Sequence, residues 1–157
     1  STGGISGGEE DHMPRLFREA GGDIRAMHIA MKPGKPLLIG KMGRAIYVGL
    51  PGNPVAAFIT WLVVGNRLAR SAAGIAPESM PRPIVRAGFD LTRRTGRCEY
   101  RPVRIVGRSA DGAQIVDLLS EFYSARIAML AQADGLALLP AGSGQVRRGD
   151  ALEFYGL

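Results

Sequence analysis

The sequence predicts an α/β unit followed by a small β-barrel or sandwich, and three observations support this. The length of 157 residues leaves room for one ordinary domain or two small ones. Prolines concentrate in residues 76–83, which is typical of a linker. The apolar pattern also changes there, from long apolar runs with helix signals to strict alternation. We therefore predict an α/β part over 1–75, a linker over 76–83 and a β domain over 84–157.

The first part begins with a glycine-rich segment and continues into a predicted helix and strand. Apolar residues on one face predict a helix from about His12 to Ala20, and Pro14 fits its first turn. Gly21 and Gly22 end it. Residues 24–31 carry apolar side chains in consecutive positions, which favours a buried strand of the parallel type. His28 is then expected to be a core histidine.

Two short strands and a long helix complete the first part. The strands are expected at 37–39 and 45–48, on either side of a polar, glycine-containing turn. A long apolar helix is expected over 54–73, because Asn53 suits the N-cap, Pro54 suits the first helical position and Gly74 ends the pattern. Its large apolar side chains are expected in a core or a dimer interface.

The second part alternates with the period of two that half-buried strands require. Apolar and polar positions alternate over 85–91 and again over 152–155. Turn signals separate the strands at 95–96, 111–112 and 141–144. Residues 124–133 are expected to form a short helix or a loop. This spacing of short strands predicts a small barrel or sandwich.

Positive charge is concentrated in one segment. The net charge is +6, and 82–108 alone holds eight arginines against Asp90 and Glu99. Such a segment suits anionic partners, among them nucleic acid, phosphorylated metabolites or oxyanions. Few aromatic residues interleave the arginines, and alternation would place them on different faces. We therefore expect a solvated barrel face rather than a nucleic-acid site.

Several protein classes are excluded by composition. The single cysteine, Cys98, rules out a disulfide framework and a cysteine-based zinc site. The longest apolar run, 55–64, is interrupted by Thr60 and is too short for a membrane span. The first residues show no secretory signal. We expect a cytoplasmic protein with no membrane partner. Because the chain begins with Ser1 in a glycine-rich loop, we also expect it to be a fragment.

Three loops could bind an anion. Residues 2–11 are glycine-rich and lead into a helix, an arrangement whose free backbone N–H groups suit phosphate. Residues 32–36 place two of the three lysines on a loop stiffened by two prolines. Residues 50–55 form a tight turn before the long helix. Each loop could also be a purely structural turn, with Asp11 acting as an N-cap in the first.

Taken together, the three loops resemble the molybdopterin molybdenumtransferase family, also called MoeA, which includes the E domain of gephyrin. The motifs that carry the resemblance are Gly3-Gly4-Ile5-Ser6 with Gly8 and Asp11, then Lys32-Pro33-Gly34-Lys35-Pro36, then Gly49-Leu50-Pro51-Gly52-Asn53-Pro54-Val55. In the second half Gly96-Arg97, 133–136 and Gly149-Asp150 are also similar. The resemblance implies the C-terminal half of a molybdopterin-binding three-layer α/β domain, followed by a C-terminal β-barrel.

The resemblance also implies an activity and its residues. Family members insert molybdate into adenylylated molybdopterin with a divalent metal such as Mg²⁺ and release AMP. By position, Asp11 would be the metal-linked catalytic acid, and Lys32 and Lys35 would face the oxyanion. The residues implied in binding the substrates are Gly3, Gly4, Ser6, Gly8, Pro33, Gly34, Pro51, Gly52, Asn53, Pro54, Arg97 and Ser124.

Partners follow from the same resemblance. It implies a homodimer of the full-length protein and a contact with the molybdopterin adenylyltransferase. Family active sites include a partner subunit's N-terminal region, so the isolated fragment is expected to be inactive. The alternative is a non-catalytic scaffold of the gephyrin type.

Overall fold

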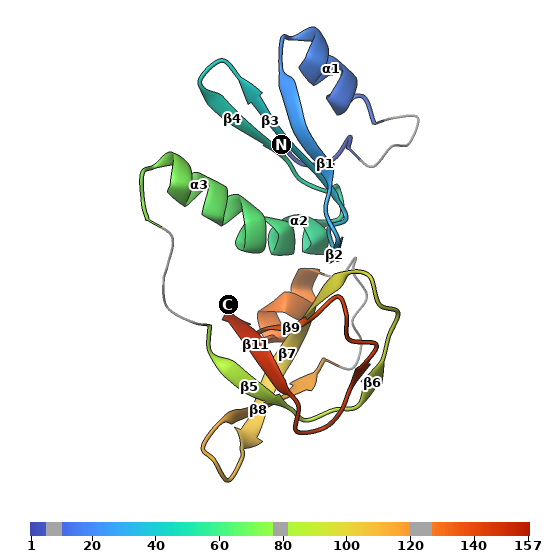
Figure 1. Ribbon diagram of the computed structural model, residues 1–157, viewed down its shortest axis with the longest axis vertical. Coiled ribbons are helices and arrows are strands. Elements are labelled where there is room, and N and C mark those ends of the chain that lie inside the picture. The colour runs from blue at the N-terminus through green and yellow to red at the C-terminus, as the bar shows by residue number, and fades with distance from the viewer. Residues whose placement is uncertain (6–10, 77–81, 120–126) are drawn as a thin grey trace. The chain divides into compact units, whose positions relative to one another are not determined.

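The computed structural model describes residues 1–5, 11–76, 82–119 and 127–157. The chain divides into two compact units (Figure 1). Unit 1 comprises Ser1–Ile29 and Pro33–Ser79, and unit 2 comprises Ala30–Lys32 and Met80–Leu157. The predicted linker over 76–83 falls largely outside the described residues. Ala30–Lys32, within the predicted first part, packs with the second unit.

The described part of unit 1 contains four helical segments and a small antiparallel sheet. The strands β1, β3 and β4 pair in the order β1-β3-β4. The elements of unit 1 are α1 (Met13–Glu19), β1 (Asp23–His28), β3 (Pro36–Met42), β4 (Ala45–Gly49), α2 (Pro54–Thr60), the π-helical segment η1 (Trp61–Gly65) and α3 (Asn66–Ala72).

The expectation for residues 24–31 was wrong in two respects. β1 ends at His28 and pairs antiparallel with β3, at the edge of its three-stranded sheet. An edge strand with one covered face alternates in burial, and β1 does so over most of its length. His28 is exposed rather than a core residue. The run of apolar residues over 24–31 suggested a single strand, but it spans two strands. Met31 already belongs to β2 (Met31–Lys32), which pairs with a strand of unit 2.

The core of unit 1 forms around the ring of Phe17. Phe17 packs with Ile5 and Leu38, all three being buried. Its ring lies so close to Gly22 and Gly40 that a Cβ atom at either glycine would meet it at 2.4 or 2.5 Å. The first helix thus docks on the sheet where two glycines leave room for an aromatic ring.

The predicted long helix is present, but it is interrupted by a wider turn. Asn53 accepts a hydrogen bond from the Ala56 backbone N–H at 3.1 Å, which is the expected N-cap. The segment η1 inserts π-helical turns between α2 and α3, so the helical path continues from Pro54 to Ala72. Trp61 lies over Gly65, where a Cβ atom would be 2.3 Å from the indole ring.

Unit 2 is a closed five-stranded β-barrel. Its strands pair in the order β7-β8-β5-β11-β9, and β9 pairs back to β7 to close the ring. The elements of unit 2 are β2 (Met31–Lys32), β5 (Ile84–Ala87), β6 (Leu91–Thr92), β7 (Cys98–Arg108), β8 (Gln114–Leu118), the 3₁₀ segment η2 (Ile127–Gln132), β9 (Gly135–Leu139), β10 (Gln145–Val146) and β11 (Ala151–Gly156). This confirms the predicted fold class, a partial α/β domain with a C-terminal β-barrel.

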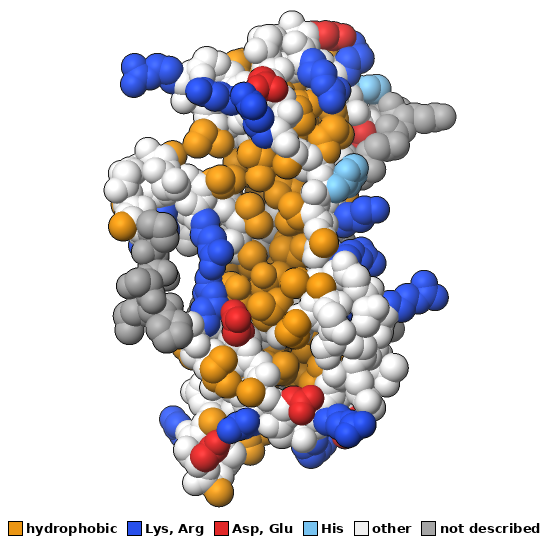
Figure 2. Space-filling model, in the orientation of Figure 1, with side chains coloured by type: hydrophobic (Ala, Val, Ile, Leu, Met, Phe, Trp, Pro, Cys, Tyr) orange, Lys and Arg blue, Asp and Glu red, His pale blue; other side chains and the backbone are white. Residues whose placement is uncertain are grey.

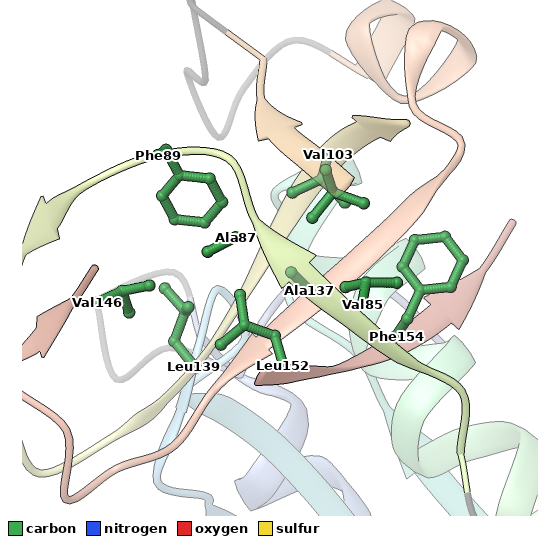
Figure 3. Close-up of a cluster of buried hydrophobic side chains, with 10 residues drawn as sticks. Val85, Ala87, Phe89, Val103, Ala137, Leu139, Val146, Leu152 and Phe154 are labelled. Carbon is green, nitrogen blue, oxygen red and sulfur yellow. The ribbon is translucent and has the colours of Figure 1, made fainter. Parts of the chain in front are cut away.

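Alternating side chains fill the barrel, as the period of two predicts. Val85 and Ala87 point inward from β5, and Leu152 and Phe154 do so from β11 (Figure 3). Val103 of β7 belongs to the same buried cluster. Because β7 pairs with β9 in continuous register from position 99 to 103, the side chains at 99 and 101 lie on the same side of β7 as Val103.

Gly135 should be intolerant of a side chain. A Cβ atom there would lie 2.3 Å from the Phe154 ring and 2.5 Å from the Tyr155 carbonyl oxygen, which is fixed by the sheet. We expect Gly135→Ala to lower the free energy of unfolding by about 2 kcal/mol or more, measured by urea denaturation. Gly107→Ala, with nothing within 4 Å, is the matched control. Equal stability of the two variants would contradict this packing.

Candidate functional site

The first and third sequence motifs lie side by side in unit 1. Gly3 donates its backbone N–H to the Leu50 carbonyl oxygen at 2.9 Å, and Thr2 bridges to Leu50 in a parallel sense. A Cβ atom at Gly52 would be 3.5 Å from the Gly3 Cα atom. The structure therefore brings together two glycine loops that lie about fifty residues apart in the sequence.

The third motif presents a capped helix start beside those glycines. Pro51 is buried, whereas Gly52 and Pro54 are exposed. The Asn53 side chain is occupied by its own helix, since Oδ1 accepts the Ala56 N–H. Asn53 thus stabilises the turn by capping α2. Because Gly52 has no side chain, the backbone at this position is accessible to solvent.

The lysine loop is divided between the two units. Pro33, Gly34 and Lys35 belong to unit 1, where the Ile29 N–H donates to the Lys35 carbonyl oxygen at 3.0 Å. Gly34 has φ of 101°, a conformation that favours glycine. Lys35 is exposed. Lys32 belongs to unit 2, and its surroundings are described below.

Asp11 lies just before α1 and is partly buried. The Met13 N–H, at the start of this helix, donates a hydrogen bond to the Gly4 carbonyl oxygen at 3.2 Å. Among the described residues, no group of three His, Cys, Asp or Glu side chains could hold a metal ion. The predicted residues Ser6, Gly8 and Ser124 lie outside the described part of the chain.

A cationic pocket lies in unit 2 at the end of the barrel strand β7. Its volume is about 230 Å³. Five cationic side chains and one carboxylate line it, so its formal charge is +4. The lining residues are Lys32, Leu91, Thr92, Arg93, Arg94, Thr95, Arg97, Glu99 and Arg101.

Glu99 is the centre of this pocket's charge arrangement. Only 4% of its side chain is exposed. Its Oε1 atom lies 3.2 Å from Lys32 Nζ and 3.0 Å from Arg101 Nη1, and Oε2 lies 3.2 Å from Arg93 Nε. Both carboxylate oxygens are therefore engaged by cations, as a buried charge requires.

Two strand relationships bring these partners together. Lys32 of β2 is the register partner of Glu99 in the parallel pairing with β7. Arg101 follows Glu99 by two positions on β7 and so lies on the same face. The Cys98 N–H donates to the Ala30 carbonyl oxygen at 2.9 Å and fixes the same pairing.

The environment of Glu99 keeps its carboxyl group ionised. Burial alone would raise its pKa, but hydrogen bonds from Lys32, Arg101 and Arg93, with the Lys32 charge, outweigh burial and hold the pKa below its ordinary value. The carboxylate thus remains charged at neutral pH and holds three cations.

Arg93 stabilises the loops around the pocket. Only 6% of its side chain is exposed. Besides Glu99, its guanidinium donates to the Pro140 carbonyl oxygen at 2.8 Å and to the carbonyl oxygens of Ser143 and Arg97. One planar group therefore joins the loop before β7 to the loop after β9, which a lysine could not do in this geometry.

Arg94 and Arg97 are exposed at the pocket. In contrast to Arg93, they are not used in the ion pairs that the described residues form around Glu99. Together with the half-exposed Lys32, they place positive charge beside the buried ion pairs of Glu99. Such an arrangement suits a small oxyanion, because fixed donors stabilise negative charge with little reorganisation.

Lys32 and Arg97, two of the residues predicted from the sequence, line this pocket. Glu99, Arg93 and Arg101 were not among the predicted residues. The expectation of a solvated arginine face was wrong for Arg93 and Arg101, of which only 6% and 19% of the side chain are exposed. One signal was available: Glu99 and Arg101 occupy positions that share the parity of Val103 on a strand whose inward face is apolar.

Comparisons with known proteins match both units. Residues 1–70 match a family model described as a probable molybdopterin binding domain, and residues 85–157 match the MoeA C-terminal region, domain IV. A molybdopterin molybdenumtransferase from a Nostoc species is 31% identical over 152 residues, covering 90% of this chain and 33% of that protein. One from Haemophilus influenzae is 32% identical over 102 residues, covering 64% and 25%. The chain thus spans about a third or less of these relatives.

Solved structures agree at the level of the fold. A molybdopterin biosynthesis MoeA protein from Pyrococcus horikoshii superposes with a TM-score of 0.74 at 20% identity, covering 93% of this chain and 34% of that one. A molybdopterin biosynthesis MoeA protein structure from Pyrococcus horikoshii OT3 gives a TM-score of 0.63 at 17% identity, covering 85% of this chain and 32% of that one.

The role of Arg93 can be tested against its neighbour. Arg93→Lys keeps the charge but cannot reach Glu99 and the loop carbonyls together, so we expect the free energy of unfolding to fall by about 2 kcal/mol. Arg94→Lys, at an exposed position in the same pocket, should change it by less than about 0.5 kcal/mol. Urea denaturation measures both. Similar losses in the two variants would show that Arg93 is not a structural bridge.

The ionisation of Glu99 predicts a pH dependence of stability. Because the folded state lowers its pKa below 4.5, the unfolded chain takes up a proton first as the pH falls, and stability is lost below that value. Glu99→Gln should lose less stability between neutral pH and pH about 3, measured by thermal unfolding. Asp111, whose pKa is lowered to about 2 by hydrogen bonds from Ser109 and Arg86, contributes equally to both proteins. Parallel pH curves would contradict the assignment to Glu99.

Proposed function

Because this chain belongs to the MoeA family, we propose that it takes part in molybdenum cofactor biosynthesis as part of a molybdopterin molybdenumtransferase. The reaction inserts molybdate into adenylylated molybdopterin and releases AMP. The matched relatives carry the name of this enzyme, which favours the transferase over a non-catalytic scaffold. The chain itself spans about a third of such a protein, so the activity is proposed for the whole enzyme.

The observation that carries the proposal is the cationic pocket of unit 2. Its charge of +4 and volume of about 230 Å³ suit a compact dianion such as molybdate. Drug-sized ligands usually occupy about 300–1,000 Å³, so this pocket suits an ion better than a whole nucleotide. Lys32, Arg94 and Arg97 would bind the oxyanion, and exposed Lys35 of unit 1 is proposed to face the anionic substrate.

The glycine loops of unit 1 are proposed to bind the pterin phosphate or the adenylate. Gly4 is partly exposed and Gly52 is exposed, and backbone N–H groups at glycine turns bind phosphate oxygens. The Gly3 N–H is used by the Leu50 carbonyl oxygen, so Gly3 would contribute to the shape of the loop. Pro33, Gly34, Pro51, Asn53 and Pro54 would set the shape of these turns. Ser6, Gly8 and Ser124, outside the described residues, remain part of the proposal.

Asp11 is proposed as the metal-linked acid. A Mg²⁺ ion at a phosphoanhydride usually takes one or two protein carboxylates and completes its shell with substrate phosphates and waters. A single partly buried carboxylate beside a glycine loop fits this pattern, although it could not form a metal cage by itself. When bound, the metal would neutralise the developing charge on the phosphoanhydride.

Partners are proposed on the same basis. The whole enzyme would act as a homodimer and receive its substrate from the molybdopterin adenylyltransferase. Phe58 and Trp61, on the helical segment of unit 1, expose 40% and 46% of their surface, which suits a face covered in a larger assembly. Figure 2 shows hydrophobic side chains open to solvent on the visible face of each unit.

In the described part of the chain, no helix is long and apolar enough to cross a bilayer. As a separate part of the proposal, the whole enzyme is placed in the cytoplasm.

The proposed activity can be tested in the full-length enzyme. We expect molybdate-dependent release of AMP from adenylylated molybdopterin, and Asp11→Asn should lower the rate at least about a hundredfold through loss of the metal contact. Asp23→Asn, at an exposed acid of the same unit, is the matched control and should keep the activity.

Two outcomes would contradict this proposal. Normal turnover by Asp11→Asn would remove the role assigned to Asp11. Absence of AMP release from the folded wild-type enzyme, with molybdopterin still bound, would favour the scaffold instead.

A further inference from the structure

We propose that Glu99 is a positioning residue for the oxyanion, acting by holding the Lys32 ammonium group against the wall of the pocket. This inference rests on the proposed function, since it concerns how molybdate is bound. It adds a residue that does not itself bind the anion. Its support is the geometry around the carboxylate.

The first step is the contrast in burial between the two partners. Lys32 leaves 51% of its side chain exposed, whereas Glu99 leaves 4%. A lysine side chain has four rotatable bonds and loses rotamer freedom when it is fixed. The fixed carboxylate at 3.2 Å therefore restrains a side chain that would otherwise sample solvent.

The second step is that Glu99 itself cannot move. Arg93 and Arg101 bind it from two further directions, and Arg93 is anchored to the carbonyl oxygens of two loops. The carboxylate is therefore fixed by the barrel and its loops, and it contacts the half-exposed lysine from that side. Binding to an already ordered cation costs less entropy than ordering it on binding.

The third step weighs the charge of Glu99 against this benefit. A carboxylate near an anion site repels the anion, so removing it should strengthen binding if charge alone mattered. Here the carboxylate is surrounded by three cations at 3.0–3.2 Å, and its charge is largely compensated. Positioning of Lys32 should then outweigh the repulsion.

The experiment is a double-mutant cycle with molybdate as the probe. Isothermal titration calorimetry on the full-length enzyme compares wild type, Lys32→Met, Glu99→Gln and the double variant. We expect each single variant to bind molybdate about tenfold more weakly. The double variant should also be about tenfold weaker, because Glu99 acts only through Lys32.

Arg104→Met is the control for loss of a cation. It removes a positive charge from the same strand at an exposed position outside the pocket and should leave the affinity unchanged. If Glu99→Gln does not fold, Glu99→Asp replaces it in the cycle. This variant keeps the charge for Arg93 and Arg101 but withdraws the carboxylate by one methylene, and it should show the same coupling to Lys32.

Each remaining outcome overturns the inference. Binding by Glu99→Gln that equals or exceeds wild type would show that repulsion dominates. A double variant about a hundredfold weaker than wild type would show that Glu99 acts independently of Lys32, as a merely structural residue would. A folded full-length wild-type enzyme that binds no molybdate would overturn the oxyanion pocket of the proposed function, and this inference with it. In the other two cases the proposed function would stand.

Discussion

The arrangement of unit 2 depends on one constraint, the need to compensate a carboxylate buried at the end of a barrel. An unpaired charge in such a place would cost several kcal/mol, so Glu99 requires partners that satisfy both oxygens. The chain supplies them from three places: a neighbouring position on β7, the loop after β6, and β2. The recruitment of β2 explains why Ala30–Lys32 packs with unit 2 although its neighbours in the sequence belong to unit 1.

A surplus of positive charge follows from this arrangement. Glu99 neutralises only one of the five cations in the pocket, and the most buried of them, Arg93, is used to join loops. The exposed cations Lys32, Arg94 and Arg97 line the pocket beside this buried ion-pair cluster. The same ion-pair cluster that stabilises the end of the barrel thus creates the surface that we propose binds the anion.

Local signals in the sequence predicted most of the elements, whereas long-range pairings decided what was missed. Asn53 and Pro54 predicted the start of the long helix, because an N-cap depends only on adjacent residues. The alternation around Val85 predicted the strands of the barrel. The strand over 24–31 was misjudged because the chain leaves one sheet and joins another after His28, a change that no local pattern encodes.

The candidate site shows the same division. Lys32 and Arg97 were predicted from motifs, which are local, while Glu99 looked like one acid among eight arginines. Its importance depends on the pairing of β2 with β7 and on the loop that brings Arg93 to it, both of which arise from the folded barrel. The pattern nevertheless held a clue in physical terms. A strand whose inward positions change from Val103 to Arg101 and Glu99 must place charge where apolar side chains are expected, and such a change costs free energy unless the charges are paired there. An arginine two residues from a glutamate on the inward face of a barrel strand is therefore better interpreted as a buried ion pair than as a solvated surface, and the remaining cations around it as a binding site.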